Sequence, residues 1–228
     1  MHGGYLTAIN DLAENGEISH ATFTTYSDWI RGDMLKRGKQ ELYLQEILSA
    51  IIKRYGSQIT WHSLANDLSI DHHKTVADYI ELLSSMDVLF VQYALREDQL
   101  GPASKKARKI VFTDPFIFHA VRAWVQPTTA VNDQELVAQL VEATVVSHYR
   151  RLYPTYYIKA DGEVDIAYIK DNKFWPVEVK WTNQLRPKDL KQISKYKNSI
   201  ILSKVPQSGL LQNIKVKPLP VALLQLGN

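Results

Sequence analysis

The stretch GEVDIAYIKDNKFWPVEVK, residues 162–180, sets the architecture of the C-terminal half of this chain. Apolar residues alternate with other residues on both sides of Asp171-Asn172, and this period of two predicts a β-hairpin. If Asp171 and Asn172 form the turn, Asp165 on the first strand faces Glu178 on the second. Residues that face each other across a hairpin lie roughly 5 Å apart at Cβ. The hairpin therefore brings two carboxylates together.

Two carboxylates at that distance repel each other, and a cation between them relieves the repulsion. Lys180 follows Glu178 by two residues and so shares its face, with Glu163 opposite it. The pattern indicates a divalent-metal site with a lysine at its edge. In the alternative interpretation, Asp165, Glu178 and Lys180 lie on the solvated face of an ordinary sheet.

The composition is typical of a soluble globular protein, with 45% hydrophobic and 22% charged residues in a chain of 228. We find no apolar run of membrane-spanning length and no charged-then-apolar leader, so we expect a cytoplasmic protein that does not bind membranes. The absence of cysteine excludes disulfides and thiolate metal sites. Residues 133–228 carry 14 Lys/Arg against 9 Asp/Glu, an excess that suits a polyanionic partner.

The N-terminal part of the chain predicts a helical lead-in, residues 1–56, followed by a winged-helix domain, residues 57–127. Helices are expected at residues 21–35, 40–54, 60–70 and 72–86, and strands at 88–95 and 108–113. The third and fourth helices are joined by a short turn, as in a helix-turn-helix, with Asp71 capping the second of the pair. The loop between the two strands ends in basic residues, as the wing of a winged helix does.

A winged helix that binds DNA places the start of its second helix in the major groove and its wing on phosphates. Six residues are candidates for these contacts: Lys74 and Thr75 on the helix, and Lys105, Lys106, Arg108 and Lys109 at the wing. The alternative is a packing or dimerisation module, which allows an oligomer. His72 and His73 point about 100° apart on a helix, so we interpret them as surface residues rather than a metal pair.

The remaining residues, 128–228, predict an α/β domain with a mixed sheet. A helix at 134–151 precedes the hairpin, and a helix at 187–197, a strand at 199–203 and extended segments at 214–226 follow it. The helix at 187–197 offers further phosphate contacts from Lys188, Lys191 and Lys195. The alternative for each lysine is a solvated helix face.

Glu142 on the first helix, Asp165 on the hairpin and then Glu178-Val179-Lys180 stand in an order that resembles the PD-(D/E)XK nuclease superfamily. The resemblance implies a restriction-endonuclease-like mixed sheet flanked by helices, and hydrolysis of DNA phosphodiester bonds. It also implies that Asp165, Glu178 and Glu142 hold Mg²⁺ (or Mn²⁺) and act in catalysis together with Lys180.

The same resemblance extends to Gln192 and Tyr196, which are similar to the Q-x-x-x-Y element of the exonuclease branch and would orient substrate or metal ligands. Glu142 departs from the pattern in one respect. It points roughly 145° away from the main apolar stripe of its helix, at 100° per residue. Either the helix is buried on both sides or Glu142 is solvated, and Glu135 is then the spare candidate.

Five further segments give the whole chain a wider resemblance to the C-terminal region of a family of archaeal and bacterial AAA-type ATPases of unknown function. They are residues 3–6, 26–33, 61–65, 112–116 and 215–220. This resemblance implies a winged helix and a nuclease-like domain that follow an ATPase domain. The sequence contains no G-x-x-x-x-G-K-[ST] loop, so we expect no ATP hydrolysis by this chain and an ATPase domain or subunit as partner. The alternative function is a non-catalytic DNA- or protein-binding regulatory segment of such an ATPase.

Overall fold

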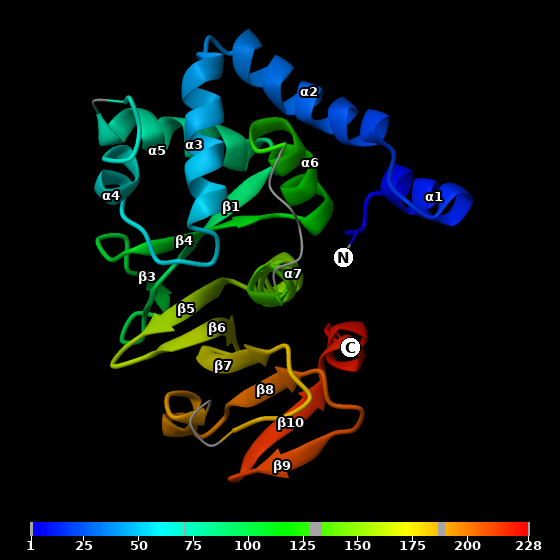
Figure 1. The fold of residues 1–228 in the computed structure, drawn as a ribbon. Helices are drawn as coiled ribbons and strands as arrows, with labels where there is room; N and C mark the ends of the chain where they lie inside the picture. Colours follow the sequence, from blue (N-terminus) through cyan, green and yellow to red (C-terminus); the bar gives the residue numbers. More distant parts are fainter. Residues whose placement is uncertain (1, 71, 128–133, 187–189, 228) are drawn as a thin grey trace. The chain divides into compact units, whose positions relative to one another are not determined.

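The computed structural model describes residues 2–70, 72–127, 134–186 and 190–227, and these residues form a mixed α+β structure with eight α-helices (Figure 1). The chain divides into two compact units. Unit 1 comprises residues 1–91 and 108–137, and unit 2 comprises residues 92–107 and 138–228. The segment predicted as the wing therefore belongs mostly to unit 2.

Unit 1 is helical apart from one pair of strands. Its helices are α1 (Leu6–Asn15), α2 (His20–Lys36), α3 (Glu41–Lys53), α4 (Trp61–Ala65), α5 (His73–Ser85) and α6 (Pro115–Val125), and β1 (Leu89–Tyr93) pairs with β4 (Arg108–Phe112). The helices expected at 21–35 and 40–54 are confirmed as α2 and α3. Helix α4 is shorter than the 60–70 expected. Ile30 of α2, Leu44 of α3 and Phe116 of α6 are fully buried, so all three helices contribute to the core of this unit.

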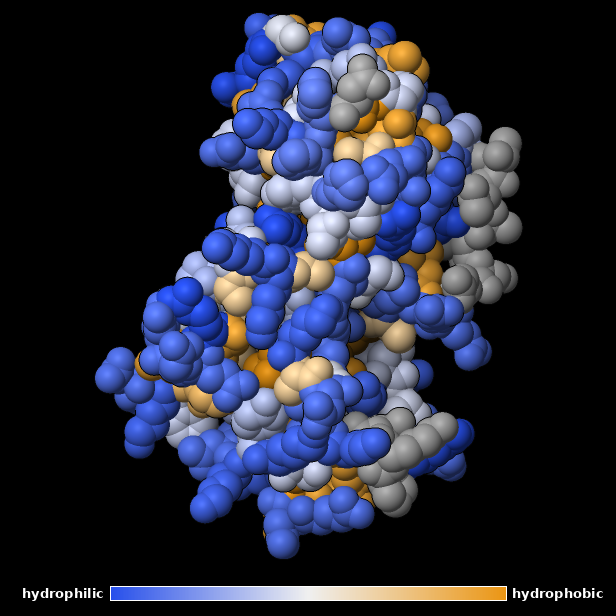
Figure 2. All heavy atoms as spheres, turned by 90° about the vertical axis from the view of Figure 1, so that its left-hand side faces the viewer, coloured by the Kyte–Doolittle hydropathy of each residue, from blue (hydrophilic) through white to orange (hydrophobic). Residues whose placement is uncertain are grey.

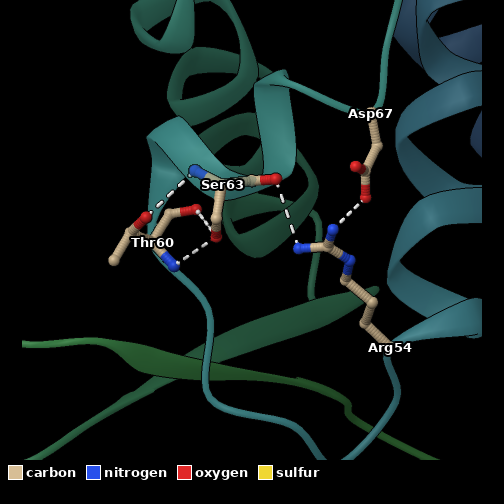
Figure 3. Close-up of polar contacts among 4 residues, drawn as sticks. All are labelled: Arg54, Thr60, Ser63 and Asp67. Atoms are coloured by element: carbon tan, nitrogen blue, oxygen red, sulfur yellow. Dashed lines mark hydrogen bonds and ion pairs between the residues drawn. The ribbon is translucent and has the colours of Figure 1, made fainter.

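Local hydrogen bonds explain why α4 begins at Trp61. The Thr60 hydroxyl accepts a bond from the Ser63 N–H, and the Ser63 hydroxyl accepts one from the Thr60 N–H, both at 3.0 Å (Figure 3). This reciprocal capping box satisfies N–H groups that a helix start leaves without partners. Arg54 donates to the Ser63 carbonyl at 3.2 Å and forms an ion pair with Asp67, which joins α4 to the end of α3. The predicted cap at Asp71 lies outside the described residues.

Asp114 connects α6 to the N-terminal segment of unit 1. One of its carboxylate oxygens accepts the Phe116 N–H at 2.7 Å and caps α6, and the other accepts the Gly4 N–H at 2.9 Å. Gly3 has φ +75°, and a Cβ placed on it would lie 1.8 Å from the Asp114 carboxylate. Only glycine fits at position 3, because a side chain there would clash with Asp114 and the positive φ would strain the backbone of any other residue.

Unit 2 is built on a six-stranded mixed sheet, as the sequence predicts. Its elements are β2 (Leu95–Arg96), β3 (Gly101–Pro102), α7 (Gln134–Leu152, which enters this unit at Ala138), β5 (Thr155–Lys159), β6 (Glu163–Lys170), β7 (Lys173–Lys180), the 3₁₀ helix η2 (Ile193–Lys195), β8 (Ile200–Ser203), β9 (Gly209–Leu211), β10 (Ile214–Pro218) and α8 (Leu219–Leu224). The strand order is β5-β6-β7-β8-β10-β9. Strands β5, β6 and β7 are antiparallel neighbours, and β8 runs parallel to both β7 and β10.

The β6–β7 hairpin has the predicted register. Its pairs run from Lys170↔Lys173 at the turn to Ile166↔Val177. Asp171 and Asn172 have φ of 53° and 54°, the left-handed values that a two-residue type I′ turn requires. Asp and Asn tolerate this conformation better than other non-glycine residues, which explains the turn position.

The prediction of a helix at residues 187–197 is wrong for the part that the structure describes, residues 190–197. The main element there is η2, and Tyr196 is already extended, with φ −112° and ψ 120°. Leu190 and Ile193 are both buried in the core of unit 2. Side chains three residues apart lie above one another in a 3₁₀ turn, so this spacing places both against the sheet without a full α-helix.

The segment 92–107 is tied to the sheet of unit 2 through Tyr157 on β5. Ala94 forms a bridge with Tyr157, and the Tyr157 hydroxyl donates to the Ala107 carbonyl at 2.5 Å. Tyr157 is fully buried. The segment therefore forms part of this unit's core instead of projecting as a free wing.

The face drawn in Figure 2 is covered mainly by hydrophilic side chains, and apolar side chains occur there in small separate areas. Among the helices that the structure describes, none is both long and apolar enough to cross a membrane.

We predict that Asp114→Ala lowers the free energy of unfolding by about 1–3 kcal/mol, because it removes the cap of α6 and the bond to Gly4 together. Urea denaturation followed by circular dichroism measures the change. Asp28→Ala removes the same charge from an exposed position of α2 and should change stability by less than about 0.5 kcal/mol. Equal stability of the two variants would contradict the structural role of Asp114.

Candidate metal centre

A β-bulge in β6 shapes the end of the hairpin away from the turn. Tyr156 on β5 pairs with Ala167 on β6, and Ile158 pairs with Val164. The two pairs are two residues apart on β5 but three residues apart on β6, so β6 contains one extra residue. An extra residue of this kind bends the strand and changes the direction of nearby side chains. Asp165 lies within the bulge.

Asp165 is held at two points, its carboxylate and its main-chain carbonyl. Its Oδ2 accepts the Val179 N–H at 2.7 Å, one residue beyond Glu178 on β7. Its main-chain carbonyl accepts a bond at 2.8 Å from the side-chain amide of Gln92, which is almost fully buried. Asp165 is itself 7% exposed. The side chain thus has a defined position where the two strands separate.

Three carboxylates converge at this point. Glu142, Glu163 and Asp165 each offer an oxygen, and the three oxygens lie within 4.8 Å of one another. Glu142 comes from α7, which lies beside β5 and β6 (Figure 1) and packs on β6 through Tyr149 and Tyr168, with ring centroids 4.9 Å apart. The structure therefore places Glu142 at the site and leaves Glu135 exposed.

The helix α7 is buried on both sides, which resolves the orientation of Glu142. Leu140 and Val141 are buried, and so are Ala143, Val145 and Val146, so buried positions surround Glu142 along the helix. A helix of this kind presents apolar residues to more than one neighbour. Glu142 can then point toward β6 even though it lies far from the main apolar stripe.

Glu178 and Lys180 form an ion pair beside the three carboxylates. The Lys180 ammonium lies 2.7 Å from Glu178 Oε1, and the side chain of Glu178 is 7% exposed. Burial and the charge of Asp165 raise the pKa of the Glu178 carboxyl, and Glu142 adds to the effect. Burial opposes the charge on Lys180, but Glu178 and Asp165 outweigh it and raise the pKa of the ammonium.

The second oxygen of Glu178, Oε2, is buried and has no hydrogen-bond partner. A buried carboxylate oxygen without a partner is costly, and a bound cation is one way to satisfy it. The surrounding donors are carboxylate oxygens, which Mg²⁺ and Mn²⁺ prefer over the nitrogen and sulfur ligands of softer metals. The residues present therefore fit a divalent cation of this class.

Gln192 and Tyr196, the two remaining predicted site residues, have different surroundings. Gln192 packs against the loop before β6, since a Cβ on Gly162 would lie 3.3 Å from the Gln192 Cβ. The Tyr196 hydroxyl donates to Glu97 at 3.3 Å, and its ring lies 5.9 Å from that of Phe174. The contacts of Gln192 thus lie next to Glu163, whereas those of Tyr196 lead toward the segment 92–107.

The predicted DNA contacts are divided between the two units. Unit 1 holds Lys74, Thr75, Arg108 and Lys109, and unit 2 holds Lys105, Lys106, Lys191 and Lys195, while Lys188 lies outside the described residues. Lys109 is only 2% exposed, so its side chain is not available on the surface for a contact with DNA. Arg108 stacks over the Trp61 ring at 4.4 Å, and Lys195 pairs with Asp161 at 3.1 Å. Lys74, Lys105, Lys106 and Lys191 are exposed.

Two residues of the site were not predicted as members, Glu163 and Gln92. Glu163 stands two residues before Asp165, so the spacing of the two acids was a usable signal. No sequence pattern marks Gln92, which lies 73 residues from Asp165 along the chain. Its role follows from the way the segment 92–107 folds onto the sheet.

The comparisons with known proteins agree with a two-part chain. Residues 1–128 match the family described as a domain of unknown function, DUF8612, and the chain belongs to this family. Residues 136–221 match a second domain of unknown function, DUF4143, which is typically found with AAA ATPases. No curated protein matches the chain.

We predict that Mg²⁺ stabilises the wild-type chain and that Glu163→Gln loses most of this effect, because it removes one of the converging carboxylates. A site filled at 100 times its Kd adds about 2.7 kcal/mol to the free energy of unfolding. In EDTA the same variant should be at least as stable as wild type, since repulsion among the carboxylates falls. Thermal denaturation with and without Mg²⁺ measures both effects.

The matched control is Asp171→Asn, which removes one charge from the exposed β6–β7 turn and keeps a residue that accepts positive φ. It should respond to Mg²⁺ as wild type does. An unchanged Mg²⁺ response in Glu163→Gln would show that Glu163 does not bind the ion.

Proposed function

We propose that this chain is a metal-dependent nuclease that hydrolyses phosphodiester bonds of DNA at the carboxylate cluster of unit 2. The observation that supports it most is the convergence of Glu142, Glu163 and Asp165 within 4.8 Å, next to the Glu178–Lys180 pair. The order helix carboxylate, strand aspartate and E-x-K is that of the PD-(D/E)XK superfamily, and the mixed sheet of unit 2 is compatible with it.

In this proposal Asp165, Glu163, Glu142 and Glu178 hold Mg²⁺ (or Mn²⁺). A divalent cation at such a site lowers the pKa of a bound water and neutralises charge on the scissile phosphate. Asp165 contributes a pre-positioned oxygen, because the Val179 N–H and Gln92 hold its side chain and its carbonyl. Preorganised ligands avoid reorganisation cost during the reaction.

Lys180 has the chemistry and the position for a second role. Its ammonium is held by Glu178 at 2.7 Å, and its side chain remains 31% exposed, so it is accessible to substrate. An ammonium here orients a water molecule through its N–H donors and stabilises the negative charge that develops on the phosphate. Lys191 is exposed and offers a further contact for the DNA backbone. The contribution of such a contact to DNA affinity falls as the salt concentration increases.

The second candidate function is a non-catalytic segment that binds DNA or protein and regulates an AAA-type ATPase. The match of residues 136–221 to a domain typically found with such ATPases favours this candidate. It differs from the first in one testable respect, because it requires no metal-dependent bond cleavage.

We predict Mg²⁺- or Mn²⁺-dependent cleavage of supercoiled, linear or branched DNA by the wild-type chain, and loss of cleavage by about 100-fold or more in Asp165→Asn. Asparagine keeps the size of the side chain and an oxygen for the Val179 N–H. Lys180→Ala should lose activity by a comparable factor while its response to Mg²⁺ in thermal denaturation remains. Gel electrophoresis of the products measures the rates.

Lys173→Ala, which removes an exposed ammonium next to the turn of the same hairpin, serves as control and should cut at the wild-type rate. Absence of cleavage by the wild-type chain, with DNA binding equal in Asp165→Asn, would favour the non-catalytic candidate.

A further inference from the structure

A pocket of unit 2 lies beside Trp175 on β7. In the strand register Trp175, Lys215 and Lys217 share one face of the sheet, and Glu178 and Lys180 lie on the other face. Its volume is about 290 Å³, and it is lined by residues of β6, β7, β8 and β10 and of the segments just before β8 and β10. The members that matter here are Tyr168, Trp175, Lys197, Lys215, Lys217 and Asn213. The volume is close to the lower limit of ligand pockets, roughly 300 Å³, and suits a small group.

The charge of this pocket is of one sign. Lys197, Lys215 and Lys217 line it, and no aspartate or glutamate is among its lining residues. No ion pair found among the described residues involves any of the three, whereas Lys39, Lys180 and Lys195 each pair with a carboxylate. Three ammonium groups around one cavity repel each other, and a bound anion relieves the repulsion.

One wall of the pocket is aromatic and held in place. The rings of Tyr168 and Trp175 are stacked, with centroids 6.5 Å apart and an interplanar angle of 20°. The Trp175 indole N–H donates to the Lys170 carbonyl at 3.2 Å, and Tyr149 and Tyr153 pack against Tyr168 at 4.9 and 5.0 Å. Trp175 remains half-buried, so part of its ring is accessible. A fixed, accessible aromatic face is suited to stacking on a flat ligand.

We propose that this pocket binds one nucleotide of a single-stranded DNA, with the base stacked against Trp175 and the phosphate held by Lys215 and Lys217. Lysines beside an aromatic platform are the combination that single-strand binding requires. Bases in a duplex are already stacked on both faces, so a platform of this kind selects an unpaired strand.

The inference deepens the proposed function, because it names the form of DNA that the nuclease takes. The two claims remain separable. Trp175 stands three residues before Glu178 on β7, a distance of roughly 10 Å along a strand, and the pocket contains none of the clustered carboxylates. Binding at the pocket therefore needs no metal, and cleavage needs the metal.

The experiment measures fluorescence anisotropy of a short fluorescein-labelled oligothymidylate with the full chain in EDTA. We expect Trp175→Leu, and separately the double variant Lys215→Ala/Lys217→Ala, to weaken binding by about 5- to 100-fold. Trp175→Phe should restore most of the affinity because it keeps a stacking ring. One control should bind as wild type: Lys53→Ala, which removes an exposed lysine of unit 1.

Three outcomes would overturn the proposal. Unchanged binding in both the lysine and Trp175→Leu variants would show that the strand binds elsewhere. A loss in the lysine variant but not in Trp175→Leu, with circular dichroism normal for both, would indicate a simple phosphate site without base stacking. Displacement of the oligonucleotide by thymidine monophosphate at equal nucleotide concentration would identify a free nucleotide as the ligand. Failure of cleavage with this binding intact would contradict only the nuclease function.

Discussion

The hydrogen bond from the Val179 N–H to the Asp165 carboxylate is the contact on which the site of unit 2 depends. It forms where β6 separates from β7, just beyond the last main-chain pair, Ile166↔Val177. A side-chain oxygen there serves a backbone donor that would otherwise lack a strand partner. The bulge in β6 makes this possible, and it also lets Asp165 approach Glu142 and Glu163. One side chain thus completes the sheet and takes part in the carboxylate cluster.

The local parts of this arrangement were predictable from the sequence, and the non-local parts were not. The register of the hairpin follows from the alternation of its strands and from Asp171-Asn172, which suit positive φ. Glu163 stands two residues before Asp165, so the period of two already places it on the face of Asp165. The position of Glu142 depends on α7 being buried on both sides, which a single apolar stripe does not reveal.

Tertiary packing also decides the conformation of two segments outside the hairpin. Leu190 and Ile193 are spaced for a helix, but their burial in the core of unit 2 is achieved with a 3₁₀ turn. The segment 92–107 has the composition of a wing, yet Tyr157 joins it to the sheet through a bond to Ala107. Because Gln92 begins this segment, the same packing brings its amide to the carbonyl of Asp165. Contacts over such separations leave no periodic signal in the sequence.

The carboxylate cluster and the pocket beside Trp175 gather charges of opposite sign. Four carboxylates and one ammonium meet near Glu178, and burial with the neighbouring acids raises the pKa of that carboxyl. A hairpin with only a structural role would be more stable with apolar residues of similar size in these positions. In the pocket beside Trp175, Lys197, Lys215 and Lys217 line a cavity that has no acidic residue among its lining residues. Under the proposed function, a cation at the cluster and an anion at the pocket would reduce both excesses, and a polyanion with its divalent counter-ion would supply the two together.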